Sequence, residues 1–395
     1  VLKEEPVVVT DKESFQPKFS PDGKEVAFLE ERTEIKIKNL ESGSVITILP
    51  GNKNYSYADG DPRFDWSPDS KYLLVHSLDP NQWITQIYLI GADGTGMVQL
   101  TKSGFENYYQ KFAMNGNMML WFSDRYGLRN HRNSGATNDV YGLFFNQEAF
   151  DRFRLSKEEL ILLKEAEKEN KDTVKSKEIK LELDGIENRK ARLTIHSSFL
   201  ADAVITPDGE QLFYLSKFEK GFDLWQTKFK DNETKLFMKL NSRSPGALKM
   251  DKDGKNLYML SEGNIVRIGI DKNERKDVPT SVVMTLNKPS EREHLFEHIW
   301  RQVLKKFYVT DLQGVDWNFY KTEYKKFLPY INNNRDFAEM ASEMLGELNA
   351  SHTGCRVFIN QPNGDNTASL GMIYDNEYKG SGIKIAEVLE ESPLI

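Results

Sequence analysis

The chain has 395 residues, more than one ordinary hydrophobic core holds, so two or three domains are expected. Its net charge of −7 provides no basic field for nucleic acid or an anionic membrane surface, and neither is expected as a partner. No run approaches the ~20 apolar residues that cross a bilayer. The single cysteine, Cys355, excludes an internal disulfide; the cytoplasm is the expected compartment, and the periplasm remains open.

The first 285 residues contain a repeat, which is a polar turn between two apolar strands. Asp-Gly or Asp-Ser supplies the tolerance for positive φ that a tight turn needs, and Pro presets the residue before it. Corresponding turn positions are 47, 46, 93 and 45 residues apart, and 93 is about twice the unit. The clear copies are FSPDGKEVAFL from Phe19, WSPDSKYLLVH from Trp66 and ITPDGEQLFYL from Ile205, and weaker copies begin at Phe112 and Met250.

Each repeat adds further strands, such as residues 33–40, and four strands in roughly 45 residues are the period of a β-propeller blade. The predicted fold class is therefore mainly β, with at least five blades over residues 1–288. Five blades are fewer than a comfortable ring, so we expect one or more blades upstream of Val1. The chain opens on Val1 and not on Met, so we expect that a leader, upstream domains or both have been removed. An insertion near residues 150–180 carries Ser156 and Glu159 at capping-box spacing, which predicts a solvated surface helix.

Past the last blade the apolar period changes from two to 3.6, and residues 289–360 are predicted to form a helical subdomain. Ser290 and Glu293 have capping-box spacing at the start of its first helix. A second helical stretch is expected over residues 317–330, and a third begins near Asp336. The apolar stripes of these helices are typical of a core and not of a cofactor site.

The third helix is expected to break before Ser351 and His352, and an apolar strand, CRVFI, then begins at Cys355. The polar linker NQPNGDNTAS follows. Residues 368–395 start a small β domain that includes the strand IKIAEVLE. Because its strand pattern stops unfinished, we expect this domain to be truncated.

Most signatures of catalytic chemistry are missing: there is no GxSxG elbow, P-loop, GxGxxG after a strand or HExxH. His294 and His298 have the i,i+4 spacing of a zinc pair, but the sequence offers no third ligand nearby, which favours two ordinary, partly exposed histidines. No metal or cofactor is expected. The propeller histidines, His76, His131 and His196, have no companions in the sequence.

Cys355 and His352 are the remaining candidates for chemistry. Cys355 is a possible nucleophile, but its apolar strand favours a small buried core residue. His352 directly follows a helix end in a segment of small residues, so its ring can reach across a domain junction. On residue chemistry alone, a structural or incidental role is the commoner one for a lone histidine of this kind.

Taken in order, the propeller blades, the helical segment, the Ser-His turn and the small β domain resemble the tricorn protease family, in the clan of the C-terminal processing peptidases. WRQVLKKFYVTDLQGVDW (residues 300–317) is similar to the helical segment of this clan, with an aromatic pair flanking a short loop. LGELNASHTG (345–354) matches the segment in which tricorn enzymes carry their catalytic Ser-His pair. SGIKIAEVLEESPL (381–394) is similar to the first strand and turn of the family's PDZ-like domain. The resemblance covers essentially the whole chain.

The resemblance implies half of the active site of a serine peptidase that degrades peptides. His352 would be the general base and Ser351 a further member of the site. The nucleophilic serine, the orienting carboxylate and the oxyanion donors would lie beyond Ile395, which leaves these residues inactive alone. The family also suggests a homo-oligomer for the full-length protein, with the propeller either a gate for peptides or a purely structural ring.

Two other functions use similar parts. A prolyl-oligopeptidase-type enzyme needs a GxSxG elbow downstream, and the change to a helical segment and a PDZ-like opening counts against it. A non-enzymatic propeller scaffold with a peptide-binding domain needs no nucleophile after Ile395 and makes His352 replaceable. The residues beyond Ile395 would separate these alternatives.

Overall fold

The computed structural model describes residues 5–56, 62–79, 84–129, 136–169, 178–358 and 369–394. The chain divides into two compact units, Val1–Ser281 and Val282–Ile395. The first holds five four-stranded antiparallel sheets and the second holds helices and a two-stranded sheet. No helix in the described ranges has the length and apolar character needed to span a membrane.

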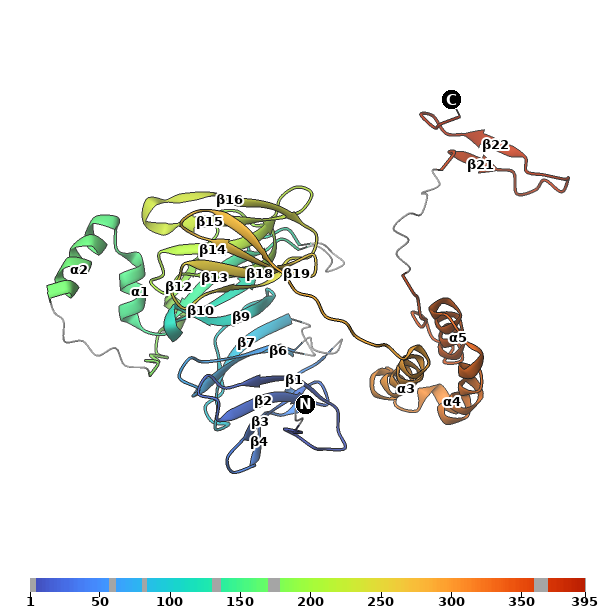
Figure 1. Ribbon diagram of the computed structural model, residues 1–395, viewed down its shortest axis with the longest axis horizontal. Helices are drawn as coiled ribbons and strands as arrows, with labels where there is room; N and C mark the ends of the chain where they lie inside the picture. The colour runs from blue at the N-terminus through green and yellow to red at the C-terminus, as the bar shows by residue number, and fades with distance from the viewer. Residues whose placement is uncertain are drawn as a thin grey trace. The chain divides into compact units, whose positions relative to one another are not determined.

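The five sheets of the first unit follow the chain, and in each the strands pair in sequence order (Figure 1). This arrangement confirms the propeller blades predicted from the repeat. The blades are β1 (Ser14–Phe19), β2 (Glu25–Glu30), β3 (Glu34–Asn39) and β4 (Val45–Leu49); β5 (Phe64–Trp66), β6 (Tyr72–Asp79), β7 (Ile84–Gly91) and β8 (Val98–Gln99); β9 (Asn107–Ala113), β10 (Met118–Ser123), β11 (Asp139–Phe144) and β12 (Lys190–Arg192); β13 (Phe199–Ile205), β14 (Gln211–Lys217), β15 (Phe222–Lys228) and β16 (Glu233–Ser242); and β17 (Gly246–Met250), β18 (Asn256–Ser261), β19 (Asn264–Gly269) and β20 (Glu274–Val278).

The repeated turn joins the first two strands of a blade, as its sequence predicts. In the first copy the Ser20 hydroxyl donates to Asp22 at 2.6 Å and accepts from the Glu25 amide at 2.9 Å, while Gly23 takes a φ of +74°. The fourth blade repeats this pattern, because Thr206 donates to Asp208 at 2.5 Å. The side chain replaces backbone partners inside the turn, so the same polar residues recur at each copy.

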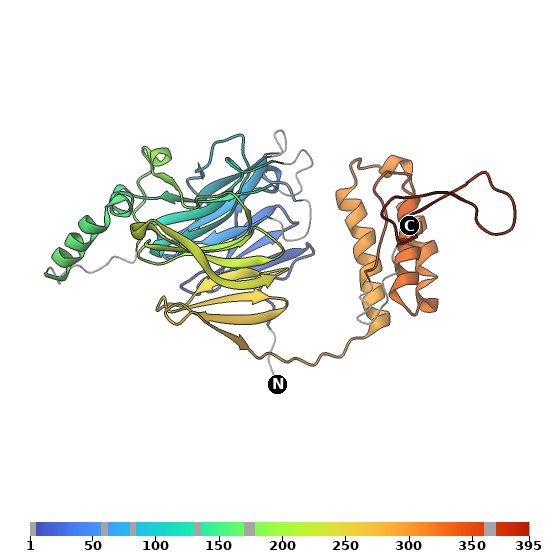
Figure 2. The same cartoon turned by 90° about the horizontal axis from the view of Figure 1, so that it is seen from above.

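Apolar side chains fill the space between successive blades. Each of four clusters joins the facing sides of two neighbouring sheets, which is how a blade buries a face that it cannot cover alone. The pairs that mark these four junctions are Leu29 with Phe64, Leu74 with Met119, Phe122 with Tyr214, and Phe213 with Leu257. Figure 2 shows the sheets stacked face to face.

Polar groups of the first strands also tie neighbouring blades together. The Asp65 carboxylate accepts from the Phe112 amide at 2.9 Å, and Asp202 accepts from the Leu248 amide at 2.8 Å. Lys111 pairs with Asp202 at 2.6 Å. Burial raises the pKa of Asp65, and the bond from Phe112 opposes that rise.

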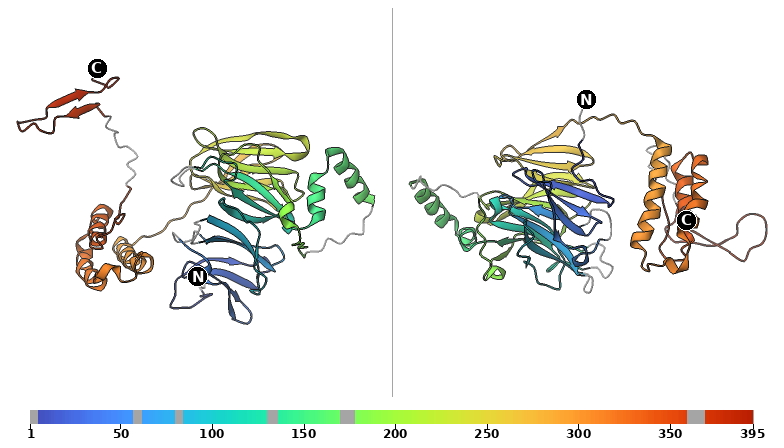
Figure 3. Two further views of the ribbon diagram at one scale, coloured as in Figure 1. Left: turned by 180° about the vertical axis from the view of Figure 1, so that it is seen from behind. Right: turned by 90° about the horizontal axis from the view of Figure 1, so that it is seen from below.

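The insertion lies between β11 and β12 and forms two helices, α1 (Gln147–Arg154) and α2 (Lys157–Glu169). Figure 3 shows both projecting from the sheets. The predicted capping box is confirmed, because the Ser156 amide donates to Glu159 at 2.8 Å and the Glu159 amide donates to the Ser156 hydroxyl at 3.2 Å. Residues 170–177 of the insertion lie outside the described ranges.

The second unit contains α3 (Lys288–Lys306), α4 (Trp317–Lys325) and α5 (Asn334–Gly346), with a short 3-10 turn at Leu328–Tyr330. Trp300 and Trp317 join α3 to α4 reciprocally: each indole N–H donates to the other residue's carbonyl, at 3.2 and 3.1 Å. The three helices enclose a common core. Its buried members are Phe296, Leu312, Trp317, Phe337, Met340, Met344 and Leu348.

Two sequence predictions in this unit are wrong. Helix α3 is capped by Asn287, whose side chain accepts from the Ser290 amide, so Ser290 and Glu293 form no capping box. The helix starts earlier than predicted because Pro289 fits the first turn, where its missing N–H costs nothing. The expected strand from Cys355 is also absent over residues 355–358, which have no strand partner among the described residues.

At the other end of this unit, β21 (Met372–Tyr374) pairs antiparallel with β22 (Ile385–Val388). Strand β22 lies within the predicted strand IKIAEVLE. The linker at residues 359–368 lies outside the described ranges. The assignment of the hairpin to a PDZ-like domain stays a prediction.

Candidate functional site

Helix α5 positions the predicted Ser-His pair. The Asn333 side chain caps the helix by accepting from the Arg335 and Asp336 amides, each at 2.9 Å. At the other end Leu348 is fully buried and Ala350 packs against the same core. The residues on either side of the helix end are therefore anchored, and the pair follows directly on Ala350.

The chain after α5 makes a tight turn with left-handed backbone conformations. Asn349 has a φ of +47° and His352 a φ of +62°. Residues other than glycine seldom adopt such values, and Asn and His are among those that do so most often. The Thr353 hydroxyl donates to the Ala350 carbonyl at 3.0 Å. The Ser342 hydroxyl of α5 donates to the Cys355 carbonyl and accepts from its amide, both at 2.8 Å. These bonds hold the turn against the helix.

Ser351 and His352 are both exposed on this turn. Neither side chain has a hydrogen-bond partner among the described residues, and no carboxylate within them orients the imidazole. The imidazole of His352 is therefore open to solvent in this part of the chain.

Cys355 is not an activated nucleophile. Burial raises the pKa of its thiol, which disfavours the reactive thiolate. The side chain is half-buried and the backbone on both sides is held by Ser342, so its role in the turn is structural. The expectation of full burial in a strand is wrong because the expected strand does not form.

The other histidines are dispersed. His294 and His298 lie on α3 with ring centroids 6.4 Å apart, and the described residues hold no group of three His, Cys, Asp or Glu that suits a metal ion. His76 accepts from the Arg63 amide at 3.1 Å. His131 lies outside the described ranges, and His196 lines a pocket.

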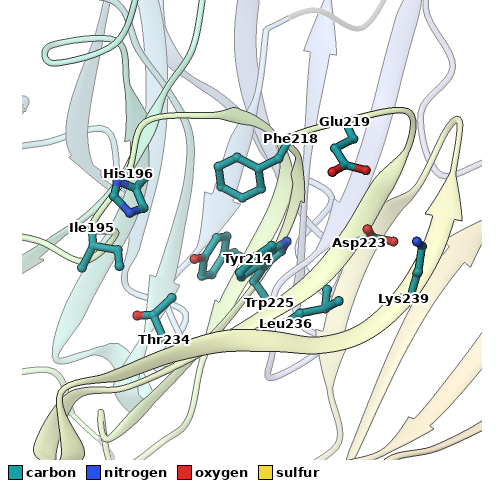
Figure 4. A pocket seen from close by; sticks show the side chains of 10 residues that line it. All are labelled: Ile195, His196, Tyr214, Phe218, Glu219, Asp223, Trp225, Thr234, Leu236 and Lys239. Carbon is teal, nitrogen blue, oxygen red and sulfur yellow. The ribbon is translucent and has the colours of Figure 1, made fainter.

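That pocket, here the aromatic pocket, lies on the fourth blade and has a volume of about 540 Å³ (Figure 4). Tyr214, Trp225 and Leu236 are cross-strand neighbours on its floor, and Phe218 stands edge-on to Trp225 at 5.0 Å. It has no serine or cysteine among its lining residues. The residues that line it are Ile195, His196, Tyr214, Phe218, Glu219, Asp223, Trp225, Thr234, Leu236 and Lys239.

Comparison with known proteins identifies the relatives of this chain. Residues 288–346 match the tricorn protease C1 domain, and this range covers α3, α4 and α5. The resemblance to the tricorn protease family is confirmed. A curated protein of Sulfurisphaera tokodaii named as a tricorn-like protease C-terminal subunit is 21% identical over 413 residues, covering 95% of this chain and 43% of that protein.

The crystal structure of the tricorn protease matches the fold with a TM-score of 0.64 at 13% identity. The match covers 95% of this chain and 37% of the tricorn protease chain, and at such low identity it concerns the fold alone. This chain thus spans less than half the length of either relative.

Proposed function

We propose that this chain supplies the general-base histidine of a tricorn-like serine peptidase that hydrolyses peptides. The supporting observation is the position of His352: an exposed imidazole, held on a left-handed turn, six residues after the end of the matched C1 domain. The nucleophilic serine, its orienting carboxylate and the oxyanion donors are proposed to lie outside residues 1–395. The peptidase is proposed to be a homo-oligomer that works in the cytoplasm.

In this proposal His352 takes the hydroxyl proton of the nucleophilic serine as its oxygen attacks the scissile carbonyl. The imidazolium then gives that proton to the leaving amine, and an acyl-enzyme remains. Water releases the second product by the same steps, with His352 again the base and then the acid. Ser351, next to the imidazole in the chain, is proposed to help hold this network.

The turn itself suits such a role. A general base has to keep one orientation through both proton transfers. The bonds from Ser342 to Cys355 and from Thr353 to Ala350 fix the backbone on the far side of His352, and Leu348 fixes the near side. The ring can therefore stay accessible while its backbone is held.

A serine-directed fluorophosphonate tests the proposal on the full-length protein. We expect the wild type to become labelled and His352→Ala to lose labelling, because without the base the serine is not activated. The matched control His298→Ala replaces a histidine of α3 and should keep it. Labelling of His352→Ala at the wild-type rate would refute the role of His352.

A further inference from the structure

A second, smaller pocket lies at the corresponding place one blade earlier. The third and fourth turn motifs are 93 residues apart in the sequence. At the same spacing, Ser103 corresponds to His196, Trp121 to Tyr214 and Arg125 to Phe218. All of these residues line one pocket or the other. The two pockets therefore lie at equivalent places on successive blades and carry different side chains at those positions. The smaller one, here the cationic pocket, is lined by Thr101, Lys102, Ser103, Asn107, Trp121, Ser123, Arg125, Tyr141 and Lys190.

A stacked aromatic pair forms the floor of the cationic pocket. The rings of Trp121 and Tyr141 are 5.2 Å apart with an interplanar angle of 26°. The Trp121 indole donates to Asn107 at 3.0 Å, so its polar atom is satisfied. The Tyr141 side chain is only 8% exposed, and its hydroxyl is buried without a hydrogen-bond partner among the described residues. A buried hydroxyl without a partner costs about 1–3 kcal/mol, which a ligand that accepts its hydrogen bond would recover.

Cations surround this floor. None of Lys102, Arg125 and Lys190 forms a salt bridge within the described residues, and Lys190 donates only to the Leu100 carbonyl, at 3.0 Å. Burial lowers the pKa of Lys190; nearby Glu187 raises it and nearby Arg125 and Lys102 lower it further. The three cations repel one another, and a bound anion would relieve that repulsion.

The volume of the pocket limits what enters it. It measures about 90 Å³, against about 540 Å³ for the aromatic pocket. Since a water molecule takes about 30 Å³, this space suits a single acid group and not a whole drug-sized ligand. The rest of any ligand has to remain outside, where Lys102 and Arg125 are exposed.

We propose that the cationic pocket binds an oxyanion, either a carboxylate or a phosphoryl group, between Lys102, Arg125, Lys190 and the Tyr141 hydroxyl. Lysine and arginine donate charge-assisted hydrogen bonds to such groups, and the neutral tyrosine hydroxyl donates one more. Burial and the neighbouring Asp139 raise the pKa of Tyr141 to about 12, so the hydroxyl keeps its proton at neutral pH. The site is independent of the proposed peptidase activity.

The aromatic pocket provides an internal comparison. Phe218 takes the place of Arg125, and Ile195 takes the place of Lys102 at the same 93-residue offset. Glu219 and Asp223 add negative charge there. The same junction geometry is thus cationic in one copy and apolar with carboxylates in the other, so only the cationic pocket should take an anion.

Calorimetric titration of the 395-residue chain at low salt tests this site, with three probes: inorganic phosphate, tri-alanine with a free C-terminal carboxylate, and tri-alanine amide. We expect phosphate or tri-alanine to bind and the amide not to bind. Binding of phosphate alone would point to a phosphoryl ligand, and binding of tri-alanine would point to a peptide carboxylate. Either supports the proposal.

Variants locate the site. Arg125→Gln and Tyr141→Phe should each weaken binding by about tenfold, because each loses a hydrogen bond to a charged group. Lys239→Gln, in the aromatic pocket, is the matched control and should leave the affinity unchanged. Circular dichroism checks that each variant folds. The absence of binding by both anions, or equal binding by Arg125→Gln, Tyr141→Phe and the wild type, would overturn the proposal.

Discussion

The side chains around the proposed site contribute mainly by forming hydrogen bonds to the backbone of the turn. Ser342 is the clearest case, because one hydroxyl satisfies both the amide and the carbonyl of Cys355. The cysteine and the histidine of this turn therefore differ in their surroundings. Cys355 is held and half-buried, whereas His352 is exposed.

Loss of the Ser342 hydroxyl should loosen the turn. We expect Ser342→Ala to reduce the free energy of unfolding of the helical unit by about 1–2 kcal/mol, because two backbone groups lose their partner. Denaturant unfolding measures the change. The matched control is Ser290→Ala, whose side chain is exposed at the start of α3, and a loss as large as that of Ser342→Ala there would contradict the assignment.

Glu297 gives the helical unit a dependence on pH. Lys321 lowers the pKa of Glu297 and Lys325 adds to the effect, through contacts of 2.7 and 3.0 Å between α3 and α4. A carboxyl group whose pKa is depressed by folding stabilises above its unfolded pKa, and that stabilisation is lost as the pH falls through the folded value.

Glu297→Gln should therefore cost up to about 1 kcal/mol at pH 7, and the difference from the wild type should fade below pH 4 as the wild-type carboxylate is protonated. Urea titrations at several pH values measure it. Glu323→Gln removes only an exposed i,i+3 pair and should change little. A cost for Glu297→Gln that stays constant down to pH 3 would show that the ion pairs are not its source.

At the scale of elements, the capping side chains decide where the helices begin. The Ser156–Glu159 box on α2 is readable from the sequence because both partners lie within one turn. Asn287 caps α3, whereas Ser290 and Glu293 offer a capping-box spacing that begins three residues later. The sequence thus contains two competing start signals, and Pro289 is compatible with the earlier one because a proline fits the first turn of a helix.

This correction has a direct test. Asn287→Ala should destabilise the helical unit by about 1 kcal/mol, the usual cost of losing an N-cap side chain, while Glu293→Gln should have almost no effect. Thermal or urea unfolding of the two variants measures both. A larger loss of stability for Glu293→Gln than for Asn287→Ala would show that Ser290 and Glu293 form the capping box after all.

The turn motifs make the blades predictable from the sequence, whereas the two pockets cannot be predicted from it. A turn such as Ser20–Gly23 is local, so four residues determine it. The cationic pocket instead joins Lys102, Arg125 and Lys190, which only the pairing of separate strands brings together. The 93-residue spacing was visible in the sequence, but comparing the residues at that offset required knowing which positions face a junction.

At the scale of the whole molecule, the two units should unfold separately because each has its own core. Phe213 belongs to a cluster between blades and Phe296 to the helical core, and both are completely buried. Phe213→Ala and Phe296→Ala should each cost about 3–5 kcal/mol, but in different calorimetric transitions. Phe358→Ala, at a residue that is 93% exposed, is the control. A single transition lowered equally by both core variants would contradict two independent units.

The blades, the helical unit and the Ser-His turn occur in the order that the tricorn resemblance implies, and the role of His352 depends on that order. The most direct test is the rate of peptide hydrolysis by the full-length protein, measured as kcat with a fluorogenic peptide. The account predicts that His352→Ala lowers kcat by about 10⁴-fold or more, as loss of a triad member does, while His298→Ala retains wild-type turnover. Turnover by His352→Ala within about tenfold of the wild type would contradict it.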